Sequence, residues 1–120
     1  MKTNQVLTRK MGEFNVLQRT SDGMFNATAL LNQWNKYNGF QKQMSHYTDN
    51  ASTEEFIKAL LSEENFKERK SVLIQTRGKN GGTWMHPLLF IDFAMWINPA
   101  FKIKVLKFVY DELLKYRNDG

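Results

Sequence analysis

No cysteine occurs among the 120 residues of the chain, so disulfide bonds and thiolate metal sites are excluded. Histidine is almost as scarce, since His46 and His86 are the only two and neither has further metal ligands at short spacing. No pair of carboxylates stands in an otherwise apolar setting, and the serine, histidine and aspartate residues are scattered. We therefore expect no enzyme, no cofactor, no metal and no small-molecule substrate.

Long hydrophobic runs are missing as well. The longest apolar-rich stretch, residues 88–97, contains Asp92 and is too short to span a bilayer. The first five residues lack the apolar run of a signal peptide. The sequence therefore predicts a soluble, cytoplasmic protein that has no membrane partner.

Positive charge is in excess. The chain has 17 lysine and arginine residues against 12 aspartate and glutamate residues, which gives a net charge of +5. This balance favours a polyanionic partner, although many small basic proteins bind nothing acidic. The positions of the charges therefore matter more than their sum.

The first half of the chain alternates strand and helix patterns. Residues 14–19 have strand character, and the turn cluster at 20–23 leads into a second short strand at Met24, which predicts a hairpin. Asn26 and Thr28 are good helix-capping residues, and the helix that follows should end at Gly39 in a left-handed conformation. Residues 40–47 suggest a second, shorter helical stretch.

The second half repeats this alternation. Ser52 and Glu55 have the spacing of a capping box in front of a third helix. Residues 72–77 and 83–86 are predicted strands, joined by a glycine-rich tip, and form a second hairpin. Pro87 suits the first turn of an apolar helix, and Asn98-Pro99 ends that helix and can start another. On this last helix an apolar face is formed by Phe101, Val105, Val109 and Leu113.

Together these patterns predict a single small α+β domain with two β-hairpins and four to five helices. Apolar residues make up 42% of the chain and aromatic residues 13%, which is enough for one core at this length. We place the domain at residues 14–117. An N-terminal arm or edge strand at residues 1–13 precedes it, and a short tail at residues 118–120 follows.

The second hairpin is the candidate nucleic-acid contact. Arg77 and Lys79 lie among three glycines at its tip, where the absence of bulky side chains lets charge and backbone approach a phosphate. Lys36 and Lys42, from the helical segment, are expected to help. Gln75 is the candidate for a contact with a base edge, because its amide both donates and accepts. The alternative is an ordinary solvated turn.

The three tryptophans, Trp34, Trp84 and Trp96, could stack on bases. Each lies within an apolar periodic segment, however, so we expect them to pack in the core, with Trp84 and Trp96 largely buried. His86 directly precedes Pro87, which favours a capping or packing role for its ring over metal binding.

Several segments carry a resemblance to a known family. Residues 19–31 read RTSDGMFNATALL, and residues 50–57 follow with the start of a middle helix. Residues 81–87 read GGTWMHP, and residues 93–101 read FAMWINPAF. In this order they resemble the KilA-N domain of viral and phage proteins, over roughly residues 14–115.

The resemblance implies a winged helix-turn-helix variant shared with fungal APSES domains. It also implies double-stranded DNA as the partner, a role in transcription regulation or as an accessory factor, and the host cytoplasm as the setting. The rival hypothesis is a protein-interaction module that keeps the fold and binds a host factor. Its support is a set of acidic residues near the proposed binding helices: Glu54, Glu55, Glu63, Glu64 and Glu68. A nuclease is the third possibility, and the sequence offers it no cluster of metal ligands.

Overall fold

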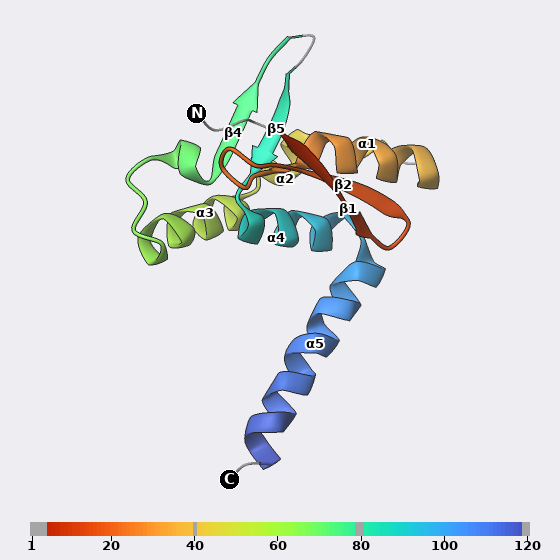
Figure 1. Cartoon of the computed structure of the whole chain (residues 1–120), viewed down its shortest axis with the longest axis vertical. Helices are drawn as coiled ribbons and strands as arrows, with labels where there is room; N and C mark the ends of the chain where they lie inside the picture. Colours follow the sequence, from red (N-terminus) through yellow and green to blue (C-terminus); the bar gives the residue numbers. More distant parts are fainter. Residues whose placement is uncertain (1–4, 40, 79–80, 119–120) are drawn as a thin grey trace.

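A five-stranded antiparallel sheet forms the centre of the computed structural model, which describes residues 5–39, 41–78 and 81–118 (Figure 1). The strands lie in the order β1-β2-β3-β5-β4. Their bounds are β1 (Val6–Met11), β2 (Phe14–Arg19), β3 (Phe25–Asn26), β4 (Leu73–Thr76) and β5 (Gly82–Met85).

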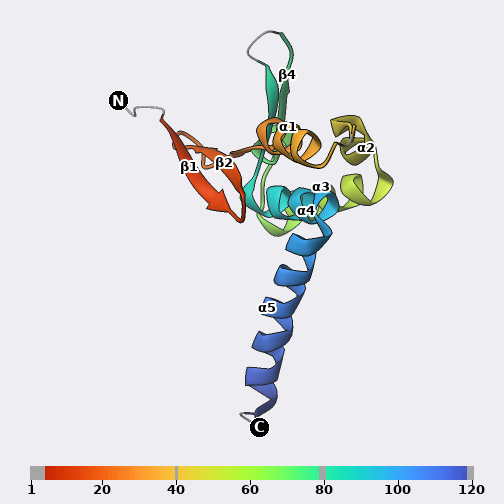
Figure 2. The same ribbon diagram turned by 90° about the vertical axis from the view of Figure 1, so that its right-hand side faces the viewer.

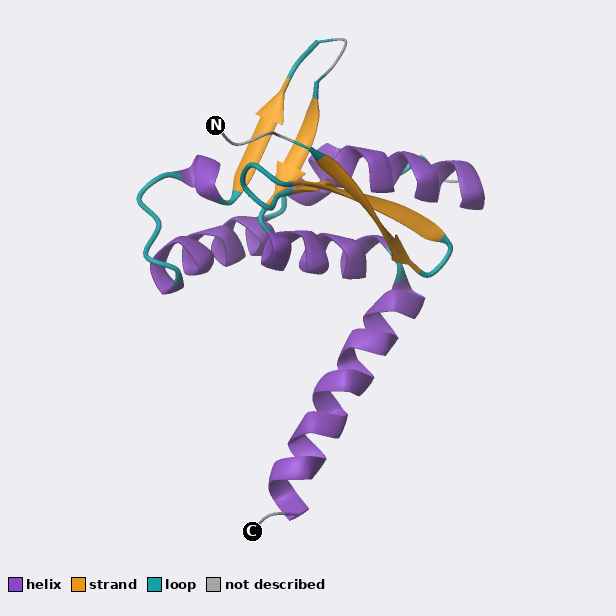
Figure 3. Cartoon of the chain, in the orientation of Figure 1, coloured by secondary structure: helices purple, strands orange, loops and turns teal. Residues whose placement is uncertain are grey.

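The described part of the chain also contains five α-helices and a short 3-10 turn (Figure 3). Helix α1 packs against β2, β5 and α4, which places the core between the sheet and the helices. The predicted α+β class, with two hairpins and up to five helices, is confirmed. The helices are α1 (Ala27–Asn38), α2 (Met44–Thr48), α3 (Ala51–Glu63), α4 (Pro87–Ile97) and α5 (Pro99–Asn118), with η1 (Arg69–Ser71) between α3 and β4.

The N-terminal hairpin differs from the predicted one. Strand β2 pairs with β1 along its whole length, from Val6 opposite Arg19 to Met11 opposite Phe14. Its pairing with β3 is limited to Gln18 opposite Phe25. The hairpin is therefore made chiefly with residues 6–11, which lie at the edge of the sheet. The domain limits at residues 14 and 117 stay predictions.

Local capping chemistry sets the helix ends. The side chain of Asn26 accepts a hydrogen bond from the backbone N–H of Ala29, and Gly39 ends α1 at a φ of 68°, both as predicted. The capping box at Ser52 is wrong, because Asn50 comes first and accepts from the backbone N–H of Ser52. The predicted cap at His86 is confirmed, since its Nδ1 accepts from the backbone N–H of Leu88 at 3.1 Å.

Aromatic rings fill the core below the sheet. Phe93 is fully buried, with its ring centroid 5.1 Å from that of Tyr47 and 6.0 Å from that of Trp96. The hydroxyl of Tyr47 donates to Oδ2 of Asp92 at 2.6 Å. Burial, helped by the nearby carboxylate, raises the pKa of Tyr47 above its ordinary value, so this hydroxyl remains a hydrogen-bond donor at neutral pH.

The two tryptophans that were predicted to be largely buried, Trp84 and Trp96, differ in their positions. Trp96 is partly buried and packs against the core, in line with the prediction. Trp84 is also partly buried, but it lies outside the core cluster, because Thr83 and Met85 on either side of it point inward. Side chains alternate along a strand, so Trp84 occupies the other face of the sheet. The expectation that Trp84 fills the core is therefore wrong.

Helix α5 projects away from the domain (Figures 1 and 2). Of its predicted apolar face, Phe101 packs against the core, whereas Val109 and Leu113 are exposed. The helices that the structure describes include none that is long and apolar enough to cross a membrane.

Candidate nucleic-acid interface

The β4–β5 hairpin extends beyond the rest of the domain, on the side opposite to α5 (Figures 1 and 2). Its strands pair in register from Leu73 opposite Met85 to Thr76 opposite Gly82. Gln75, Thr76 and Arg77 are all exposed near the end of this ladder. A projecting hairpin with exposed polar and basic groups has the shape needed to reach the backbone or a groove of a duplex.

Glycine is required at the tip of this hairpin. Gly78 has a φ of 104°, which is strained for any residue with a side chain. A Cβ added at Gly81 would lie 2.4 Å from the backbone oxygen of Thr76, so no side chain fits there. The backbone N–H of Gly81 donates to the oxygen of Gly78 at 3.0 Å and closes the turn. These two glycines keep side chains away from the backbone on either side of the tip, so backbone groups there can approach a ligand.

The foot of the hairpin is attached to α1. The backbone N–H of Thr83 donates to Oγ1 of Thr28 at 2.9 Å, across 55 positions of sequence. A Cβ at Gly82 would lie 3.6 Å from the same Oγ1, so the strand and the helix are in close contact. Thr28 therefore does not cap α1 but positions the hairpin, while Asn26 provides the cap.

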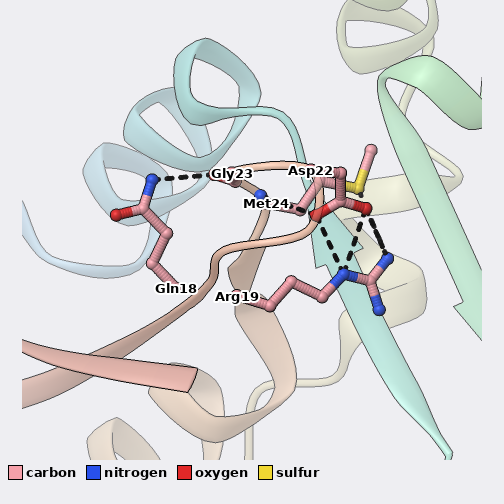
Figure 4. A network of polar contacts seen from close by, with 5 residues as sticks. All are labelled: Gln18, Arg19, Asp22, Gly23 and Met24. Atoms are coloured by element: carbon pink, nitrogen blue, oxygen red, sulfur yellow. Dashed lines mark hydrogen bonds and ion pairs between the residues drawn. The ribbon is translucent and has the colours of Figure 1, made fainter. Parts of the chain in front are cut away.

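A network of polar contacts around the turn at residues 20–23 lies beside the hairpin, on the outer face of the sheet (Figure 4). The guanidinium of Arg19 forms an ion pair with Asp22 at 2.9 Å and lies 4.5 Å from the ring centroid of Trp84. Burial alone would raise the pKa of Asp22, but hydrogen bonds from Arg19 and from the N–H of Met24 together hold that pKa below its ordinary value. Asp22 is thus ionised and balances Arg19, which reduces the charge that Arg19 offers to an anion.

The structure brings two of the five predicted contact residues together. Gln75 and Arg77 share the hairpin, whereas Lys79 lies outside the described residues. Among the described residues Arg77 has no ion-pair partner. Lys36 is exposed in the last turn of α1, beside a depression lined by Glu13 and Tyr37, away from the hairpin. Its contact with DNA stays a prediction.

Lys42 has partners inside the protein. Its Nζ donates to the backbone oxygen of Ile97 at 3.2 Å and to that of Trp96 at 3.4 Å, at the C-terminal end of α4. The same Nζ lies 5.0 Å from the ring centroid of Trp96. Hydrogen bonds between the backbone of Lys42 and the side chain of Asn35 fix this position. A cation at a helix C-terminus complements the helix dipole, so the geometry favours a structural role for Lys42.

Replacing Lys42 with methionine is expected to lower the free energy of unfolding by about 1–2 kcal/mol, because the carbonyl groups at the end of α4 lose their cation. Lys36→Met is the matched control and should change stability by less than about 0.5 kcal/mol, as exposed substitutions usually do. Urea denaturation followed by circular dichroism measures both. Equal stability of the two variants would contradict the structural role of Lys42.

Thr76 is a further candidate contact residue, which the sequence patterns did not single out. Its hydroxyl accepts from the backbone N–H of Gly82 at 3.2 Å, and its side chain is exposed on the hairpin beside Arg77. Its position directly before Arg77-Gly78 is a signal that could have identified it. Threonine hydroxyls are common phosphate contacts, so Thr76 joins Gln75 and Arg77 in the candidate interface.

Acidic groups neutralise the basic residues at the foot of the hairpin. Arg69 pairs with Glu54 at 2.9 Å, and Lys70 pairs with Glu68 at 3.1 Å. Within the described ranges, no group of three or more histidine, aspartate or glutamate residues is arranged to hold a metal ion. Arg77 on the hairpin has no such acidic partner among the described residues.

Comparison with known proteins places these features in context. The chain matches the family model described as the KilA-N domain over residues 9–113. It is 30% identical to a KilA-N domain-containing protein of Acanthamoeba polyphaga mimivirus over 100 residues, which cover 80% of this chain and 28% of that protein. It is 38% identical to the protein kilA of Escherichia phage P1 over 48 residues, which cover 40% of this chain and 18% of that protein. The chain thus spans less than a third of the length of these curated relatives. No solved structure matches it.

Proposed function

The chain belongs to the KilA-N domain family of viral and phage proteins, and on this premise we propose that it binds double-stranded DNA through the β4–β5 hairpin. The observation that carries the proposal is the projecting hairpin, with exposed Gln75, Thr76 and Arg77 beside Gly78 and Gly81, two positions whose backbone suits only glycine. The net charge of +5 supports it.

Each group on the hairpin has a distinct task. The guanidinium of Arg77 presents a planar fork of donors, which suits two oxygens of one phosphate. Gly78 and Gly81, which have no side chains, let the backbone come close to the same phosphate. Gln75 precedes Arg77 by two positions, and its amide matches the donor and acceptor of adenine in the major groove. Phosphate contacts would position the protein, and Gln75 would supply any sequence preference.

The viral and phage origin of the relatives supports a setting for this activity. We propose a regulator or accessory factor that acts on phage or viral DNA in the host cytoplasm, with transcription as the regulated step. The second candidate is a module that binds a host protein and retains the fold. It is favoured by the exposed acidic residues of α3 and the segment after it, which would repel phosphate: Glu55, Glu63, Glu64 and Glu68.

A mobility-shift titration with a random-sequence duplex at several salt concentrations tests the proposal. The logarithm of the binding constant should fall linearly with the logarithm of the salt concentration, by about 0.9 for each phosphate that the protein neutralises. A single strand of the same length serves as the comparison and reports strand preference. Absence of duplex binding even at low salt would overturn DNA binding and favour the protein-interaction candidate.

A further inference from the structure

Helix α5 carries several large apolar side chains that the rest of the described structure leaves exposed. Phe101 in its first turn packs against the core, whereas most of the helix projects away from the domain (Figure 2). Ile103 and Leu106 are each 54% exposed, Val109 is 49% exposed, and Tyr110 and Leu113 are 60% and 62% exposed. A contiguous apolar surface of this kind marks a site of interaction.

The geometry points to a second copy of this chain as the occupant: we propose that α5 pairs with the α5 of a second molecule, in antiparallel orientation. Ile103, Leu106, Tyr110 and Leu113 recur at spacings of three, four and three, which places them along one stripe of the helix. Val109 and Leu114 flank this stripe. Two such helices can interlock their stripes as in a coiled coil.

The available area fits a dimer. Five apolar side chains that are about half exposed, at roughly 100 Å² each, offer on the order of 500 Å² per copy. The methylene stems of the flanking Lys102 and Lys107 add to this. Pairing would therefore bury roughly 1,000 Å² in total, which is the size that a specific protein interface needs.

Charge favours the antiparallel orientation. In a parallel pair, the residues that flank the stripe would bring Lys102 of one copy next to Lys107 of the other. An antiparallel pair centred near residue 108 replaces the two contacts between Lys102 and Lys107 by a single one, between the Lys107 side chains of the two copies. Asp111 and Glu112 lie on the side of the helix away from the stripe.

The pairing does not depend on DNA binding, although it has a consequence for it. Helix α5 and the β4–β5 hairpin extend in opposite directions, so a dimer through α5 leaves both hairpins free (Figure 1). If the proposed function holds, one dimer presents two DNA-binding hairpins. The dimer is tested without DNA, so failure of one proposal leaves the other intact.

Sedimentation equilibrium of the full chain over a range of concentrations provides the first test. We expect a mass of twice 14.1 kDa at high concentration. Leu106→Glu should give a monomer, because it places a charge in the stripe. Phe108→Glu is the matched control: Phe108 is 67% exposed but lies on the opposite side of the helix, so this variant should still form a dimer.

Circular dichroism establishes that both variants keep the helical fold. A wild-type chain that stays monomeric at every concentration would overturn the proposal. So would a Leu106→Glu variant that remains dimeric, or a Phe108→Glu variant that dissociates to the same extent. Each of these outcomes excludes the chosen stripe as the interface, and the first leaves the apolar face to a different protein.

Orientation is tested by cross-linking, which is straightforward because the chain has no cysteine. A mixture of Ile103→Cys and Leu113→Cys chains should form a mixed disulfide, since these positions face each other in the antiparallel pair. The Ile103→Cys chain alone should not cross-link, because the two substituted positions would be about 15 Å apart, beyond the reach of a disulfide. Rapid cross-linking of the Ile103→Cys chain alone would overturn the antiparallel arrangement.

Discussion

Replacing Phe93 with alanine is expected to lower the free energy of unfolding by about 3–5 kcal/mol. The side chain is fully buried on α4 and contacts the rings of Tyr47, Phe90 and Trp96. Phe90 and Trp96 lie on the same helix and Tyr47 lies on α2, so loss of the ring leaves a cavity between the two helices. Because domains of this size are stable by only about 5–15 kcal/mol, this loss leaves a considerable fraction of the chain unfolded.

Urea denaturation followed by far-ultraviolet circular dichroism measures this change. Phe108→Ala is the matched control, since it removes the same ring from a position that is 67% exposed on α5. That variant should stay within about 0.5 kcal/mol of the wild type. Equal losses for the two variants would contradict the position of Phe93 at the centre of the core.

The features that sequence predicted best depend on neighbouring residues alone. Asn26 caps α1 through a bond to a backbone group three residues later, and Gly39 ends it in a left-handed conformation. His86 and Pro87 start α4 by the same kind of local chemistry. Capping residues can be recognised in a sequence because the backbone group that each one binds lies within one helical turn along the chain. Capping at Ser52 failed because Asn50 provides an equivalent group two residues earlier.

Features that depend on distant contacts were harder to predict. The apolar residues of segment 6–11, which are Val6, Leu7 and Met11, do not alternate as in a half-buried strand, so the pairing of this segment with β2 is not evident from its pattern. Trp84 was placed in the core because it lies within an apolar segment, although its inward-pointing neighbours Thr83 and Met85 turn its side chain to the other face of the sheet. On that face its ring contacts the guanidinium of Arg19, which is remote in sequence.

The same distinction applies to the candidate site. The glycine-rich tip and its basic neighbours were apparent from sequence, because turn residues have strong local preferences. Lys42 was grouped with them by charge, yet its Nζ reaches the end of α4, more than fifty positions along the chain. A lysine's sequence context does not reveal which carbonyl groups its long side chain will reach.

The largest effect on DNA binding is expected at the tip of the β4–β5 hairpin. Arg77→Ala should weaken binding to a random duplex by roughly tenfold or more, as the loss of a charge-assisted hydrogen bond usually does. The salt slope should fall by about one unit, and in the Arg77→Ala/Lys79→Ala double variant by about two. The measurement is a titration at several salt concentrations, with folding checked by circular dichroism.

Lys115→Ala is the charge-matched control for Arg77→Ala. It removes one positive charge from α5, which extends away from the hairpin, and its side chain is 71% exposed (Figure 1). A general effect of net charge would weaken binding equally in both variants, whereas a contact at the hairpin weakens only Arg77→Ala. A folded double variant with unchanged affinity and salt slope would exclude the hairpin as the DNA contact.

Gln75→Ala separates positioning from sequence recognition. The side chain is neutral, so its removal releases no counterion and should leave the salt slope unchanged. If its amide contacts a base edge, the variant should lose about 1–3 kcal/mol of discrimination between the preferred duplex and one altered at the contacted position. Competition between those two duplexes measures this difference. A uniform loss of affinity for both duplexes would instead assign Gln75 to the phosphate backbone, alongside Arg77.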